Sequence, residues 1–154
     1  MKKVTLLFAA LLMFAYVNAQ SAKEELDLMQ AAFGMEKKAM VAEFVKVDAA
    51  QKDAFWKLYD EYETARKDLG AKRVQLLDKY ATEFDKLTNE SMDKMLTETI
   101  DLQKKTDALI LSYTNKIKKV TSPVVAFQFY QVENYILSGI RLSILEALPL
   151  PDLK

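Results

Sequence analysis

The stretch that decides the fold begins with Phe55-Trp56-Lys57-Leu58-Tyr59-Asp60-Glu61-Tyr62. Its apolar side chains recur every three or four residues and continue at the same spacing: Phe55, Leu58, Tyr59, Tyr62, Ala65, Leu69, Leu76, Leu77, Tyr80 and Phe84. Charged side chains occupy most of the other positions, which is the pattern of an amphipathic helix. The pattern predicts one helix from Asp48 to Phe84, with a length of roughly 54 Å at 1.5 Å per residue.

The rest of the chain has the same helical character. It contains only three glycines and three prolines, which indicates few turns and long elements, and no stretch alternates with the period of a strand. We therefore expect an all-α protein, a long antiparallel hairpin with two further helices packed at its open end. The four helices are expected at 22–45, 48–84, 90–119 and 123–148.

Three of these helices begin at recognisable caps. Asp48 and Gln51 have the spacing of a capping box, in which each side chain satisfies a free backbone N–H of the first turn. Thr88 or Asn89 can cap the third helix after a reversal at residues 86–89. Ser122 precedes Pro123, and proline is favoured at the first helical position.

The aromatic residues divide the hairpin into two regions. Trp56 points roughly a third of a turn away from the Phe55–Tyr62 stripe, so the apolar arc is widest near the open end. We expect a core of several helices there and a thinner two-helix projection at the tip. The side chains proposed to meet a partner protein are Trp56, Tyr59, Phe127 and Tyr135, and an exposed Trp56 would make its stretch the first candidate for binding.

The last helix is apolar around nearly its whole circumference, with only Glu133, Arg141 and Glu146 charged between Val124 and Leu148. Such a helix must be covered on all sides. Its polar residues argue against membrane insertion. Two readings remain, a central helix among the others or a helix whose outer face is buried in a second subunit. We expect both together, and hence a homodimer.

Glu133 lies on the same face as several apolar residues of the last helix, where an unpaired carboxylate would be expensive. Helix levels counted from the open end place it near Tyr62 and Arg66. The sequence thus predicts a Glu133–Arg66 ion pair or a hydrogen bond from a tyrosine. We interpret the carboxylate as structural rather than functional.

The N-terminus is typical of a signal peptide over residues 1–19. Lys2 and Lys3 precede an apolar run from Val4 to Val17, and small residues suit cleavage after Ala19. An uncleaved membrane anchor is the alternative, although the run is shorter than the ~20 residues needed to span a bilayer. We expect export to the periplasm and a single helical domain over residues 20–154, with 20–34 frayed before Gly34.

Composition excludes several kinds of site. The chain has no cysteine and no histidine, which rules out thiol chemistry, Ser-His and Cys-His nucleophiles and ordinary zinc sites. Removal of residues 1–19 would leave 20 basic against 22 acidic residues, a balance that does not favour nucleic-acid binding. We expect no catalytic residues, no bound metal and no cofactor.

Several segments resemble a known family. Val47-Asp48-Ala49-Ala50-Gln51 and Leu87-Thr88-Asn89-Glu90-Ser91 stand where Spy/CpxP-like periplasmic proteins carry their LTxxQ motifs. A closer resemblance, over residues 37–150, is to an uncharacterised exported branch. It rests on three segments: the Lys-Lys-Ala-x-Val-Ala-Glu segment at 37–43, the Phe-Trp-x-x-Tyr-x-x-Tyr segment at 55–62 and Tyr-Gln-Val-Glu-Asn at 130–134.

The resemblance implies a cradle-shaped helical dimer in the periplasm. It further implies an ATP-independent chaperone that binds unfolded proteins in response to envelope stress. The alternative is a regulatory or scaffold module that binds one folded envelope partner, such as a sensor domain. An enzyme is the remote third reading, because no catalytic constellation emerges from the sequence.

Overall fold

The structure is a computed structural model that describes residues 34–150, and all of its regular elements within that range are helical. The predicted signal peptide and the stretch 20–33 lie outside the described residues. The all-α expectation is confirmed, with four α-helical segments and no strand between residues 34 and 150. The described part divides into two units, a hairpin unit at 45–131 and an end unit made of residues 34–44 and 132–150.

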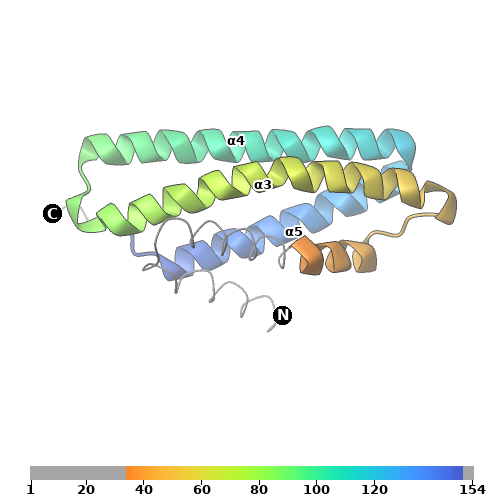
Figure 1. The fold of residues 1–154 in the computed structure, drawn as a ribbon, viewed down its shortest axis with the longest axis horizontal. Helices are drawn as coiled ribbons and strands as arrows, with labels where there is room; N and C mark the ends of the chain where they lie inside the picture. Colours follow the sequence, from red (N-terminus) through yellow and green to blue (C-terminus); the bar gives the residue numbers. More distant parts are fainter. Residues whose placement is uncertain (1–33, 151–154) are drawn as a thin grey trace. The chain divides into compact units, whose positions relative to one another are not determined.

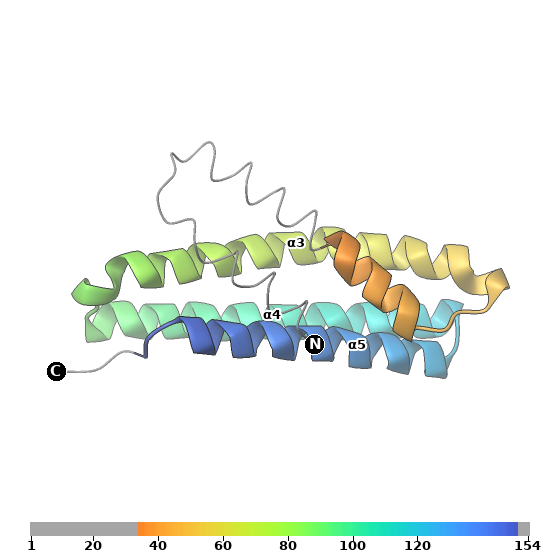
Figure 2. The same cartoon turned by 90° about the horizontal axis from the view of Figure 1, so that it is seen from below.

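Two long helices build the hairpin unit. Helix α3 runs from Lys52 to Glu83, a 3-10 turn (η2) follows at Phe84–Lys86, and α4 runs from Asn89 to Val120. The two helices lie side by side in both views and run antiparallel (Figures 1 and 2). This is the hairpin that the sequence predicts. The short connection between α3 and α4 leaves them no arrangement other than side by side and antiparallel.

The start of the hairpin differs from the prediction. Asp48 and Gln51 form no capping box, since neither side chain makes a capping hydrogen bond. A 3-10 turn (η1) at Ala49–Gln51 comes before α3. Within it the Gln51 N–H donates to the Asp48 main-chain carbonyl at 2.9 Å, and the Gln51 side-chain amide donates to the Thr121 carbonyl at 3.5 Å. The backbone thus takes the place of the predicted cap.

The other two caps are present. The Ser91 N–H donates to the Thr88 hydroxyl at 3.2 Å and the Thr88 N–H donates to the Ser91 hydroxyl at 2.9 Å, which is a reciprocal capping box at the start of α4. Ser122 accepts a hydrogen bond from the Val125 N–H at 3.2 Å. Helix α5 follows this cap and runs from Pro123 to Ala147.

The core of the hairpin unit gathers at its open end. Tyr62 of α3 lies between rings of two other helices, with its centroid 5.5 Å from Tyr113 of α4 and 5.4 Å from Phe129 of α5. The apolar residues of α3 are buried at Phe55, Tyr59 and Tyr62 but not beyond Glu63. The three-helix core and the thinner tip agree with the sequence prediction.

The end unit joins the helix over residues 34–44 to the part of α5 from Val132 onward. Val41 and Lys37 of the first segment are buried, and so are Val132 and Glu133 of α5. None of the described helices is long and apolar enough to cross a membrane.

Candidate protein-binding surfaces

Tyr59 and Trp56 were expected on a partner surface, and the structure places them differently. Tyr59 is fully buried, and its ring stacks on Phe55 at 6.3 Å and meets Trp56 edge to face at 5.4 Å. Trp56 is half-buried and makes a second edge contact with Phe55 at 5.0 Å. Tyr59 is therefore a core residue, because it continues the buried stripe, whereas Trp56 is only half-buried.

Phe127 lies on an exposed apolar ridge at the start of α5. Val124, Phe127 and Tyr130 are spaced by three residues, which places them in one row along a helix, and they are 65%, 62% and 40% exposed. Val125, Ala126 and Phe129, on the opposite face of the same turns, are buried. We call Val124, Phe127 and Tyr130 the α5 ridge, and it belongs to the hairpin unit.

The α5 ridge is positioned by polar contacts at its base. The Lys46 N–H donates to the side-chain carbonyl of Gln128 at 2.9 Å, which ties the segment before η1 to the second turn of α5. Together with the Ser122 cap this fixes the first turns of α5 on the hairpin. The ridge is thus an apolar row on a well-anchored helix, which is the form that a rigid docking surface takes.

Tyr135 begins a second row of exposed apolar side chains on α5, in the end unit. It is 62% exposed, and Leu142 lies seven residues further along, on the same line of the helix, with 57% exposed. Leu145, one turn beyond, is 67% exposed. These three residues form a second apolar strip, the end-unit strip. The prediction that a second subunit covers the outer face of α5 stays a prediction.

Glu133 makes an ion pair that the sequence did not predict. Its Oε2 accepts from Lys37 Nζ at 2.7 Å, and both side chains are 1% exposed. Lys37 comes from the helix at 34–44, so the pair joins the two segments of the end unit. Arg66 belongs to the hairpin unit, and the predicted Glu133–Arg66 pair stays a prediction.

Arg66 has a partner in its own helix. Its guanidinium donates to both carboxylate oxygens of Glu63, with Nε 3.0 and 3.1 Å from Oε1 and Oε2 and Nη2 3.0 Å from Oε2. The two side chains are 13% and 11% exposed. The three-residue spacing of Glu63 and Arg66 puts them on adjacent positions of one helix face, a signal that the sequence offers.

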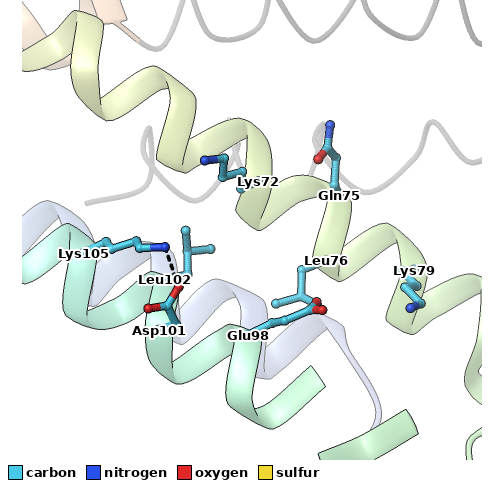
Figure 3. A pocket seen from close by; sticks show the side chains of 8 residues that line it. All are labelled: Lys72, Gln75, Leu76, Lys79, Glu98, Asp101, Leu102 and Lys105. Carbon is cyan, nitrogen blue, oxygen red and sulfur yellow. Dashed lines mark ion pairs between the residues drawn. The ribbon is translucent and has the colours of Figure 1, made fainter. Parts of the chain in front are cut away.

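A shallow groove of about 310 Å³ lies between α3 and α4, closer to the tip than to the open end (Figure 3). Leu76 of α3 and Leu102 of α4 point into it. Its rims are charged, with Lys72 and Lys79 on α3 and Glu98, Asp101 and Lys105 on α4. Lys105 Nζ lies 2.6 Å from Asp101 Oδ2, the pair marked by a dashed line in Figure 3.

The aromatic pair at the end of α3 lies beyond this groove. Tyr80 meets Phe84 edge to face, with ring centroids 5.5 Å apart. Desolvation raises the pKa of the Tyr80 phenol above its ordinary value of 10.0. The raised pKa reflects the partly apolar surroundings of this ring at the tip.

Between residues 34 and 150, no group of three or more acidic side chains is placed to hold a metal ion. The described carboxylates lie along helix faces, and the groove that holds two of them is wide and shallow. The arrangement can bind a partner through apolar area and charge.

No protein-family model, no curated protein and no solved structure matches the chain in comparisons with known proteins. The surfaces must therefore be judged by their own geometry. Sequence patterns identified Phe127 and Tyr135, but they missed Val124, Leu142 and Leu145. The exposure of these three residues depends on which side of α5 the other segments cover. Because α5 is apolar around nearly its whole circumference, helical periodicity alone does not show that side.

Proposed function

We propose that this chain is an exported, ATP-independent, chaperone-like protein that binds unfolded proteins through exposed apolar surface. The observation that carries the proposal is the α5 ridge, in which Val124 and Phe127 are more than half exposed on the first turns of a helix whose opposite face is buried. Contiguous exposed apolar residues commonly mark protein-binding sites. The signal-peptide pattern at residues 1–19 and the resemblance to Spy/CpxP-like proteins support the periplasm as the place of action.

The surroundings of the α5 ridge suit weak and repeated binding. Three exposed lysines lie close to the ridge. Lys118 and Lys119 precede it by a few residues in the chain, and Lys46 is hydrogen-bonded through its backbone N–H to Gln128 of α5. Charges around an apolar contact raise the rate of encounter more than they raise affinity. A holdase needs this combination, because its clients must also leave without the help of ATP.

The test is suppression of aggregation. A denatured model enzyme is diluted into buffer without ATP, and its light scattering is followed with increasing amounts of the mature protein. The wild type is expected to lower the scattering, and Phe127→Ser to lower it less. Leu96→Ser is the matched control, since Leu96 is 57% exposed on α4, away from the ridge. No effect of the wild type at stoichiometric excess would remove the proposal.

A second candidate is a regulatory or scaffold module with one folded partner. The rigid anchoring of the α5 ridge by Ser122 and Gln128 favours it, because a fixed surface suits a single complementary partner. A pulldown from envelope extract separates the two candidates. Many proteins in similar amounts indicate a holdase, and one stoichiometric protein that depends on Phe127 indicates a module.

We further propose that a second copy of the chain covers the end-unit strip. Tyr135, Leu142 and Leu145 are exposed. The first two are seven residues apart and Leu145 lies three residues further on, which together is the a/d spacing of a helix–helix seam. Sedimentation at micromolar concentration is expected to give a dimer, and Leu142→Glu a monomer. A monomeric wild type would overturn this part and leave the holdase proposal standing.

A further inference from the structure

The groove between α3 and α4 is the part of the hairpin unit where apolar packing is incomplete. At the open end three helices bury Tyr62, Tyr113 and Phe129 against one another. Beyond Glu63 no residue of α3 is buried, although Leu76 continues the stripe. Leu76 is half-exposed in the groove, above the buried Leu102. The groove thus has an apolar floor, formed by Leu76 and Leu102, that the two hairpin helices cover only in part.

The rims of this groove carry charges that the described part of the chain leaves unneutralised. Asp101 is paired with Lys105 at 2.6 Å. Lys72 and Lys79 on the opposite rim have no ion-pair partner among residues 34–150, and neither has Glu98. The two lysines are seven residues apart, which is two helical turns and about 10.5 Å along α3. The α3 rim is therefore a line of two free cations beside an apolar floor.

We propose that this groove docks an acidic amphipathic helix of a partner protein. Carboxylates seven residues apart on such a helix match the separation of Lys72 and Lys79, since both follow the same helical rise. Apolar side chains between the carboxylates would cover Leu76. Charge complementarity with Lys72 and Lys79 requires negative charge on the side of the partner helix that faces α3. Glu98 on the α4 rim favours a cationic or uncharged side chain of the partner opposite it.

The walls of the groove decide that the occupant is a helix and not an extended strand. Both walls are helices, whose backbone N–H and C=O groups are bonded within the helix, so an added strand would find no backbone edge to pair with. A helix needs no such edge, because its own backbone is already satisfied. It would also extend the three-helix packing of the open end toward the tip.

This inference deepens the proposed protein-binding function and rests on it. The probe is a synthetic 21-residue helical peptide with glutamates at seven-residue spacing and leucines on the same face, titrated into the full mature protein by calorimetry. Wild type is expected to bind it, and a matched peptide with glutamine in place of glutamate to bind more weakly. The Lys72→Glu/Lys79→Glu variant is expected to bind the acidic peptide at least about tenfold more weakly.

The control variant is Lys52→Glu/Lys67→Glu, which makes the same charge change at two exposed positions of α3 that lie a third of a turn or more around the helix from the groove lysines. It is expected to keep wild-type affinity. Circular dichroism checks that all variants remain helical. Equal losses of affinity in the control variant and in the groove variant would overturn the proposal, because they would show attraction by net charge alone. If the wild type suppresses aggregation but does not bind the peptide, the proposal for the groove is wrong and the proposed function still stands.

Discussion

Lys37 Nζ lies 2.7 Å from Glu133 Oε2, and the two side chains are almost completely shielded from water. The residues are 96 positions apart in the chain. Lys37 stands in the helix over residues 34–44 and Glu133 in the part of α5 from Val132 onward. The buried ion pair therefore joins the two segments of the end unit.

Removal of the lysine from this pair is expected to destabilise the protein strongly. Lys37→Met takes the cation away from a buried carboxylate, and breaking a buried pair from one side costs about 3–5 kcal/mol. Urea unfolding followed by circular dichroism measures the change. The double variant Lys37→Met/Glu133→Leu is expected to recover most of the loss, because an apolar replacement of both partners is often neutral. A single variant as stable as the wild type would contradict the buried pairing.

Phe129 and Phe127 offer a matched pair of truncations two residues apart. Phe129→Ala empties a fully buried site against Tyr62 and is expected to lower the free energy of unfolding by about 3–5 kcal/mol. Phe127→Ala removes a side chain that is 62% exposed, and should change stability by less than about 0.5 kcal/mol. Thermal unfolding of both variants compares them directly. Similar losses for the two would mean that α5 is rotated from the position described above.

The capping box of α4 is expected to contribute measurably to the hairpin. Thr88→Ala removes the acceptor for the Ser91 N–H, and the loss of such a cap costs about 1 kcal/mol. Thr97→Ala is the control in the same helix. Thr97 is exposed and its hydroxyl donates only to the Asp93 carbonyl one turn earlier. If the two alanine variants have the same urea midpoint, the cap contributes nothing.

Asp48 and Ser122 should respond differently to alanine. Ser122→Ala loses the hydroxyl that accepts from Val125, with an expected cost of about 1 kcal/mol. Asp48→Ala leaves the main-chain carbonyl that accepts from Gln51 in place, so its expected change is within about 0.5 kcal/mol. Denaturant titration of both variants provides the comparison. A larger loss for Asp48→Ala would restore the capping box that the sequence predicts.

Local patterns predicted the elements and their boundaries well. The α3 stripe, the reversal before α4 and the Ser122-Pro123 start of α5 depend on residues near one another in the chain, and each is found within a few residues of its expected place. The Asp48 cap failed for an equally local reason. A 3-10 turn bonds the backbone at the same place, and a capping-box pattern does not distinguish the two.

The partners of side chains were harder to predict. Lys37 is a partner of Glu133, and nothing in the spacing of either helix sets their relative level, because a long segment separates them. Tyr59 and Trp56 show the same limit on a smaller scale. Both lie at the edge of one apolar arc, and only the packing of the other helices decides that Tyr59 is buried and Trp56 half-buried.

The edge contacts of Trp56 with Phe55 and Tyr59 give the molecule a built-in optical reporter. The chain contains a single tryptophan, so tryptophan fluorescence, excited at wavelengths that tyrosine does not absorb, arises from one place, the open end of the hairpin unit. The tip, with Tyr80 and Phe84, is invisible to that signal. Emission and helicity therefore report different stretches of α3, and their transitions will separate if the tip frays before the open end unfolds.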